Sequence, residues 1–239
     1  YPPGNLRSIS ISQEDYDCMK PGEFLNDTCI EFYFKYLERS LEVGDPDLGE
    51  QVYCFNTFFY KQLTQTNGEG GGGAMGPGSL AEVNYKAVKK WTSKARLFER
   101  DYIFIPIHEN FHWYLALICN PGKCLIEDEE KEDKDAEWLY LALTLPHLFP
   151  LPSPFIVIFD SLDGRHPRVF SHLRAYLNEE AHHKLGRAVD FSRIRGVYAK
   201  VPRQSNFCDC GVFLLHYVER FLANPKKFTQ ILAVSGEEH

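Results

Sequence analysis

The sequence predicts an α+β or mixed α/β domain, because helical patterns lie near both ends of the chain and short apolar runs lie between them. Near the N-terminus, residues 25–37 carry apolar side chains about one helical turn apart, and Asn26 or Asp27 can cap that helix. Near the C-terminus, residues 212–222 repeat the pattern. A chain of 239 residues can bury a substantial core, so we expect residues 1–239 to form one domain.

Three apolar runs in the middle of the chain predict buried strands. They span residues 102–107, 113–119 and 155–159. Further helices are expected over residues 51–63, 85–91 and 169–177, the first of them for its dense aromatic content.

Two segments interrupt these patterns and are expected to be insertions. Residues 67–79 contain seven of the 17 glycines and predict a flexible linker whose composition suggests an engineered join. Residues 127–137 hold eight acidic residues and two lysines, a net charge of −6 out of the −7 of the whole chain. This second segment predicts a solvated acidic loop.

Charge, hydropathy and cysteine use exclude several classes of function. Outside the acidic loop the chain has 25 acidic and 24 basic residues, which argues against a nucleic-acid-binding surface. No apolar run reaches the roughly 18 residues that span a bilayer, so we expect no membrane contact. The start at Tyr1 is no signal peptide and lacks an initiating Met, which suggests a fragment of a longer protein. Seven scattered cysteines indicate an intracellular reducing compartment rather than a disulfide framework.

The most informative local feature is Cys210, at the start of the C-terminal apolar helix. A helix N-terminus carries about half a positive charge, which stabilises a thiolate, and Gly211 lets a substrate approach the backbone. The alternative is a buried structural cysteine. A zinc site shared with Cys208 is disfavoured, because no second pair with zinc spacing is present, and we predict no metal.

Three further residues can complete a thiol mechanism. His112 precedes an apolar strand and can act as the base, and Asp160 ends another strand and can orient that base. Gln204 lies six residues before Cys210 and can donate to the oxyanion of a tetrahedral intermediate. Each has an ordinary structural explanation alone, but together they supply nucleophile, base, orienting acid and oxyanion donor.

On these residues the chain resembles the Ulp/SENP family of SUMO-specific cysteine proteases. Gln204 with Asp209-Cys210-Gly211 is similar to the family's nucleophile motif, His112-Trp113 to its base, and Phe159-Asp160-Ser161 to its acid. Further similar stretches are residues 22–27, 32–33, 58–63, 88–91 and 101–106. The resemblance covers roughly residues 5–222 without the two insertions, and is greatest to the divergent branch that trims SUMO chains.

The resemblance implies a papain-like or adenain-like cysteine protease fold, in which a central mixed sheet is flanked by helices and the nucleophile lies at a helix N-terminus. It implies that the catalytic residues are His112, Asp160, Gln204 and Cys210. The family usually has a further C-terminal helix, which we expect to be missing here.

The resemblance also implies three substrate-binding residues. Phe24, where other members have Trp, and Trp113 are expected to form a lid over the Gly-Gly tail of the modifier. Asp27 matches a position that pairs with a basic residue of SUMO.

The function that follows is a SUMO-specific isopeptidase that hydrolyses the bond after the Gly-Gly tail, deconjugating SUMO or trimming poly-SUMO chains. We expect no cofactor, SUMO and SUMO conjugates as partners, a monomer and a nuclear location. Two alternatives stay open: a protease for another ubiquitin-like modifier, NEDD8 or ubiquitin, and a catalytically inactive module that only binds SUMO.

Overall fold

The computed structural model of the chain describes residues 1, 8–65, 83–126 and 153–234. The expected linker at 67–79 and the expected acidic loop at 127–137 lie outside these ranges.

Five strands of the described residues form one mixed sheet, and their order in the sheet follows their order in the chain. They are β1 (Val52–Cys54), β2 (Tyr102–Glu109), β3 (His112–Cys119), β4 (Phe155–Phe159) and β5 (Arg195–Tyr198). The central strand β3 runs antiparallel to β2 and to β4. At the two edges, β1 runs parallel to β2 and β5 runs parallel to β4. The predicted strands are therefore the centre of the sheet.

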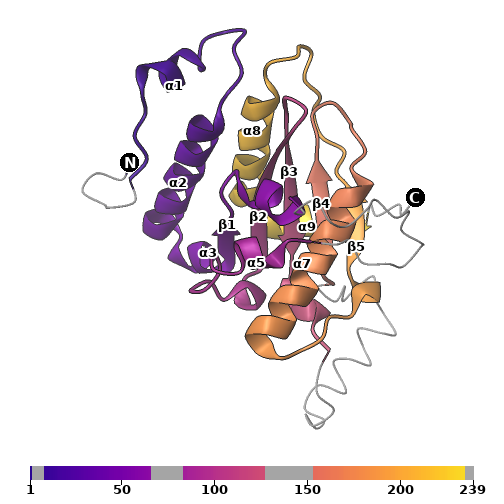
Figure 1. Cartoon of the computed structure of the whole chain (residues 1–239). Coiled ribbons are helices and arrows are strands. Elements are labelled where there is room, and N and C mark those ends of the chain that lie inside the picture. The colour runs from indigo at the N-terminus through magenta and orange to yellow at the C-terminus, as the bar shows by residue number, and fades with distance from the viewer. Residues whose placement is uncertain (2–7, 66–82, 127–152, 235–239) are drawn as a thin grey trace.

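Helices cover both faces of the sheet, which is why the central strands are continuous apolar runs. One face packs against α4 (Phe59–Thr64), α5 (Tyr85–Val88) and α7 (Pro167–Leu185), and the other against α2 (Asp27–Gly44), α8 (Cys210–Ala223) and α9 (Pro225–Val234). The shorter elements are α1 (Gln13–Asp17), α3 (Pro46–Gln51), η1 (Leu97–Glu99), η2 (Pro121–Cys124) and η3 (Phe191–Arg193). Figure 1 shows α7 and α8 on opposite sides of the strands.

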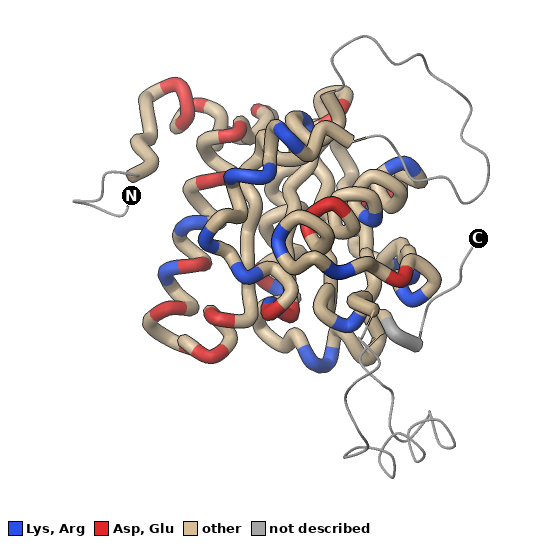
Figure 2. Tube along the Cα trace, turned by 60° about the horizontal axis from the view of Figure 1, so that its bottom comes forward, with Lys and Arg blue, Asp and Glu red and all other residues tan. Residues whose placement is uncertain are grey.

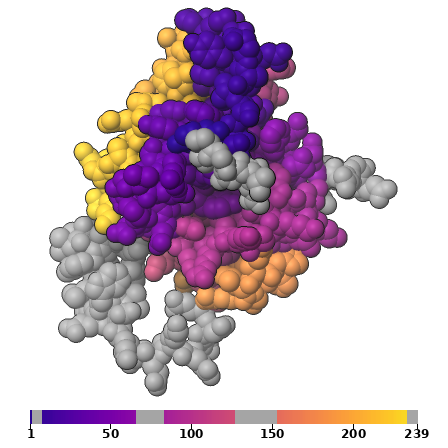
Figure 3. Space-filling model, turned by 90° about the vertical axis from the view of Figure 1, so that its left-hand side faces the viewer, coloured from indigo at the N-terminus to yellow at the C-terminus, as the bar shows by residue number. Residues whose placement is uncertain are grey.

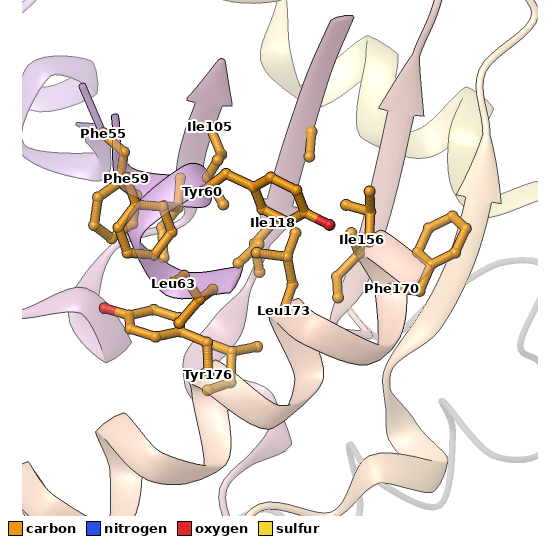
Figure 4. Packing of buried hydrophobic residues seen from close by; sticks show 14 of the residues in the cluster. Phe55, Phe59, Tyr60, Leu63, Ile105, Ile118, Ile156, Phe170, Leu173 and Tyr176 are labelled. Carbon is orange, nitrogen blue, oxygen red and sulfur yellow. The ribbon is translucent and has the colours of Figure 1, made fainter. Parts of the chain in front are cut away.

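Successive side chains of a strand point to opposite faces of the sheet, so the hydrophobic core consists of two clusters, one on each face. On β2, Ile103 and Ile105 join the cluster under α4 and α7, whereas Tyr102 and Phe104 join the cluster under α2 and α8. Figure 4 shows the first cluster, where the rings of Phe55 and Phe59 stack and Leu173 and Tyr176 approach from α7.

Two predictions about the elements are wrong. Residues 51–63 are not one helix: Val52 to Cys54 pair with Tyr102 to Phe104 as β1, and the helix begins only at Phe59. Residues 52–54 form a strand because they pair with β2, which lies 50 residues further along the chain. The spacing of apolar residues within 51–63 does not reveal this distant partner. The helix that we expected to be missing after α8 is present as α9, which buries Leu232 in the core.

Other boundaries differ in length. The helix predicted over 85–91 ends at Val88, and the one predicted over 169–177 extends from Pro167 to Leu185. Neither β5 nor the short helices α1 and α3 was anticipated.

Lys and Arg are interspersed with Asp and Glu along the described part of the trace (Figure 2). Among these residues no helix combines the length and the apolar character needed to cross a membrane.

Candidate active site

The four residues singled out for chemistry lie at one end of the sheet, on three neighbouring segments. His112 is the first residue of β3, and Asp160 directly follows the last residue of β4. Because β3 and β4 are antiparallel, with Leu115 opposite Phe159, the start of one strand lies beside the end of the other. Cys210 is the first residue of α8, and Gln204 lies in the segment between β5 and α8.

A tight turn sets the position of His112. Glu109 pairs with His112 across a two-residue loop of Asn110 and Phe111, which have φ values of 53° and 62°. Two positive φ values in succession are typical of the type I′ turn, whose twist matches that of the flanking strands. Asn tolerates this conformation, but for Phe111 it is uncommon, and its side chain is exposed. The turn holds His112 in register at the sheet end.

His112 connects the acid to the thiol. Its Nε2 lies 2.8 Å from Oδ1 of Asp160. A carboxylate can only accept, so Nε2 carries the hydrogen and Nδ1 is the nitrogen left for the thiol. The Cys210 side chain acts on the same imidazole, because hydrogen bonding to it helps to raise the pKa of His112. The order Asp160, His112, Cys210 is that of an orienting acid, a base and a nucleophile.

The side chains of Cys210 and His112 shift each other's pKa in opposite directions. Burial raises the pKa of Cys210, but hydrogen bonds from His112 and from the backbone N–H groups of Trp113 and Gly211 bring the net pKa below its ordinary value. Burial lowers the pKa of His112, but hydrogen bonds to Asp160 and Cys210 outweigh it and raise the pKa to about 9. His112 is therefore an imidazolium near neutral pH, and the thiolate form of Cys210 is favoured relative to that of an ordinary thiol.

Asp160 is buried and stays ionised. Burial raises the pKa of this carboxyl, but hydrogen bonds from His112, His166 and the backbone N–H of Leu162 hold it well below its usual range. The Leu162 N–H donates to Oδ1 at 2.7 Å, and Nε2 of His166 lies 2.7 Å from Oδ2. Both carboxylate oxygens thus have donors.

The side chain of Gln204 is held with its amide nitrogen toward the nucleophile segment. Ser161 Oγ donates to Oε1 at 2.5 Å, and Nε2 donates to the backbone oxygen of Asn206 at 2.7 Å. An amide nitrogen has two hydrogens, so one remains for an incoming oxygen. Gln204 therefore has a free donor beside the α8 N-terminus.

The expected substrate-binding residues differ in exposure. Phe24 is 47% exposed, whereas Trp113 is 2% exposed and donates its indole N–H to the backbone oxygen of Leu25 at 2.8 Å. His108 stacks on the Trp113 ring at 4.4 Å between centroids. Most of Trp113 is thus core, and it fixes the segment that carries Phe24.

Asp27 is the first residue of α2, and Asn26, rather than Asp27, caps that helix by accepting from the Cys29 N–H at 3.0 Å. Among the described residues no ion pair of Asp27 is found. Its half-buried carboxylate can therefore pair with an incoming cation.

All seven cysteines are free thiols. In the described part of the chain no group of three or more His, Cys, Asp or Glu side chains could hold a metal ion. A cavity of about 640 Å³ lies elsewhere, between α2, β1 and residues 91–100, with Glu31, Lys35 and Arg100 in its lining. Figure 3 views the α2 side of the molecule. The cluster around Cys210 contributes nothing to this cavity.

Sequence reasoning missed two residues of this cluster. Ser161 was named only as part of the motif around Asp160, although its hydroxyl orients Gln204. His166 was not singled out, because it lies in a polar turn with no periodic pattern. The signal available was its distance of six residues from Asp160, which is short enough for the chain to return to the carboxylate.

The chain matches known proteins along nearly all its length. It is 40% identical over 233 residues to ubiquitin-like-specific protease 2 of Schizosaccharomyces pombe, covering 95% of this chain and 35% of that protein. It is 34% identical over 259 residues to sentrin-specific protease 7 of Homo sapiens, covering 94% of this chain and 24% of that protein. The chain thus spans only about a third or a quarter of the length of these relatives.

Solved structures share the fold. The crystal structure of a de-sumoylating protease superposes with a TM-score of 0.68 at 24% identity, over 96% of this chain and 74% of that one. The C-terminal Ulp1 protease domain, solved in complex with Smt3, the yeast ortholog of SUMO, gives a TM-score of 0.57 at 24% identity, over 92% of this chain and 75% of that one. The predicted α+β protease fold, with a mixed sheet between helices, is confirmed. Residues 23–233 match the C-terminal catalytic domain of the Ulp1 proteases, and the chain belongs to the Ulp1 protease family.

Proposed function

We propose that the chain is a thiol isopeptidase that hydrolyses the bond after the Gly-Gly tail of SUMO and trims poly-SUMO chains. The observation that carries this proposal is the position of His112, which bonds Asp160 at 2.8 Å through Nε2 and whose pKa is raised by both Asp160 and the Cys210 side chain. Family membership supports a protease, and the relatives named for ubiquitin-like modifiers and for sentrin support the class of substrate.

The first step is attack by the Cys210 thiolate on the carbonyl carbon of the terminal glycine. His112 takes the thiol proton or holds it already as an imidazolium, and in both cases the thiolate is the attacking species. The sulfur–carbon bond forms as the carbonyl π-electrons move to oxygen, giving a tetrahedral oxyanion.

Two donors are assigned to that oxyanion. The free N–H of Gln204 is one, and the backbone N–H of Cys210 at the start of α8 is the other. The positive end of the α8 dipole favours the same charge. Loss of one such donor typically costs about 100- to 1,000-fold in rate, so these groups carry a large share of the catalysis.

Collapse of the intermediate breaks the carbon–nitrogen bond. His112 gives its proton to the leaving lysine amine and becomes a neutral base. It then takes one proton from water, whose oxygen attacks the thioester carbon. The carbon–sulfur bond breaks, Cys210 regains its thiolate and His112 its proton, and the carboxylic acid formed on the modifier loses the second water proton to solvent.

Access to the thiol favours a tail without side chains. Cys210 is only 1% exposed, so a substrate carbonyl must enter through a narrow opening. Glycine lacks the Cβ that would collide there. Exposed Phe24, held by the Trp113 bond to Leu25, is proposed to close over this tail, and the Asp27 carboxylate to pair with a basic residue of SUMO.

The test is cleavage of a di-SUMO chain beside a SUMO precursor. Wild type should cleave the chain faster than the precursor. Cys210→Ser should abolish turnover and keep SUMO binding, whereas Cys208→Ser, a matched loss of a neighbouring thiol, should keep most activity.

Two results would overturn the proposal in different ways. Reaction with NEDD8- or ubiquitin-tail probes but not with SUMO probes would assign another modifier. SUMO binding without a single turnover by wild type would make the chain a binding module.

A further inference from the structure

The Asp160 carboxylate accepts hydrogen bonds from two histidines, one at each oxygen. His112 bonds Oδ1 at 2.8 Å, and His166 bonds Oδ2 at 2.7 Å. Both oxygens can only accept, so the Nε2 of each histidine carries a hydrogen. The mechanism proposed above uses His112 and leaves His166 without a role.

His166 is itself held rigidly. Its ring stacks on Tyr114 with centroids 3.8 Å apart and planes inclined by 14°. Its backbone N–H donates to the hydroxyl of Tyr198 at 3.0 Å. The side chain is 19% exposed, so the ring is largely shielded from water. Because the Tyr114 ring and the Tyr198 hydroxyl hold His166 in place, His166 can in turn hold the Asp160 carboxylate in one orientation.

The loop between Asp160 and His166 leaves room for this contact. A Cβ added at Gly164 would lie 2.5 Å from Oδ2 of Asp160 and 2.9 Å from Nε2 of His166. Both atoms are ends of side chains, so any larger residue at 164 pushes the carboxylate and the imidazole apart before it disturbs the backbone. The glycine thus permits the second histidine to reach the acid.

We propose that His166 is a positioning residue for the triad: it locks the Asp160 carboxylate through Oδ2, so that Oδ1 stays aligned with the Nε2–H of His112. This proposal rests on the proposed thiol mechanism. A carboxylate with a donor on one oxygen only can turn about its Cβ–Cγ bond, and the imidazolium then loses its partner for part of the time. Misplacement of a reacting group by about 1 Å can cost on the order of 100-fold in rate.

Two substitutions separate the hydrogen bond from the packing. His166→Phe keeps a ring on Tyr114 and removes the donor. His166→Gln removes the ring and keeps an N–H at the position of Nε2. His172→Phe is the matched control, because His172 is also a half-buried histidine with one hydrogen bond, at 2.8 Å to Tyr60, outside the triad.

The first readout is steady-state hydrolysis of a SUMO-tail fluorogenic substrate. His166→Phe should lower kcat about 10- to 100-fold with KM unchanged, His166→Gln should stay within about 3-fold of wild type, and His172→Phe should match wild type. Should His166→Phe fail to fold, Gly164→Ala takes its place with the same expected loss of kcat.

The second readout needs no modifier and so separates this proposal from the substrate assignment. The alkylation rate of Cys210 by iodoacetamide over a pH series reports the range in which thiolate and imidazolium coexist. The titratable or charged groups around this pair and His166 include Asp160, Tyr114 with Glu109 on its hydroxyl, Tyr198 with Arg165 over its ring, His108, and Tyr217 of α8. In His166→Phe the lower limit of this pH range should rise and its upper limit should fall, because His112 loses part of its contact with Asp160. In His166→Gln both limits should stay at their wild-type values.

Wild-type kcat and an unchanged alkylation range in His166→Phe would overturn the positioning role, as would an equal loss in His166→Phe and His166→Gln. A wild-type enzyme that alkylates normally but cuts no SUMO substrate would refute the substrate assignment alone, and the alkylation series would still decide the role of His166.

Discussion

The hydroxyl of Ser161 donates to Oε1 of Gln204 at 2.5 Å, from the residue that directly follows Asp160. One strand end therefore orients both the base, through Asp160, and the amide, through Ser161. Since Oε1 is occupied by a donor, the amide nitrogen must face the nucleophile segment, where it bonds the Asn206 oxygen at 2.7 Å.

Gln204→Ala should lower kcat by about 100- to 1,000-fold and leave KM nearly unchanged, because the lost donor acts only when charge develops on the oxyanion. Steady-state kinetics on a SUMO-tail fluorogenic substrate measures both constants. A raised KM with kcat untouched would make Gln204 a substrate clamp instead.

Ser161→Ala should give a smaller loss of kcat than Gln204→Ala, about 10-fold, because the amide remains but its orientation is no longer fixed. The same assay applies, with thermal unfolding as a check of the fold. A loss in Ser161→Ala equal to that in Gln204→Ala would mean that Ser161 does more than orient the amide.

The pH dependence of kcat/KM should follow the thiolate–imidazolium pair. Because the pKa of Cys210 is lowered, activity should be established at a pH below the ordinary thiol pKa. Because the pKa of His112 is raised to about 9, activity should fall only as the pH passes about 9 and the imidazolium loses its proton. A profile that keeps rising above that value would show that His112 does not supply the proton to the leaving amine.

Phe24 and Trp113 should respond differently to truncation. Phe24→Ala should raise KM and lower kcat with little change in unfolding temperature, because 47% of this side chain is exposed. Trp113→Ala should destabilise the fold by about 3–5 kcal/mol, because that ring is 2% exposed and holds Leu25. Kinetics and chemical denaturation, run in parallel, check the contrast, and equal stability losses would contradict it.

Gly211→Ala should displace Leu25 and with it the neighbouring lid residue Phe24. A Cβ there would lie 2.9 Å from Cβ of Leu25, an atom next to the backbone that cannot swing aside. We expect a loss of about 1–3 kcal/mol in stability and a raised KM, since Phe24 moves with Leu25. Gly49→Ala in α3 is the control, because its nearest neighbour atom lies at an ordinary 3.5 Å. An unchanged KM in Gly211→Ala would show that the position of Phe24 does not depend on the contact between Leu25 and α8.

Residues with strong local patterns could be predicted, and those defined by distant partners could not. Residues 102–107, 113–119 and 155–159 read as strands because both faces of the central sheet are covered. The four residues from Arg195 to Tyr198 have one buried member, Val197, and become β5 only by pairing with β4.

The site shows the same division. His112, Asp160 and Cys210 stand at the ends of apolar elements, which the sequence marks, and the structure brings them together. Ser161 and His166 act through contacts that loops make in three dimensions, so no periodic pattern marks them, and the short distance from Asp160 to His166 permits their contact without predicting it.

The central claim is that Cys210 is the nucleophile, and its neighbour Cys208 offers the sharpest comparison. Burial and the adjacent Asp209 raise the pKa of Cys208, whereas the net pKa of Cys210 is lowered despite its greater burial. Reaction with a SUMO C-terminal vinyl sulfone, followed by peptide mass spectrometry, should place one adduct on Cys210 and none on Cys208. An adduct on Cys208, or labelling that persists in Cys210→Ser, would contradict the account.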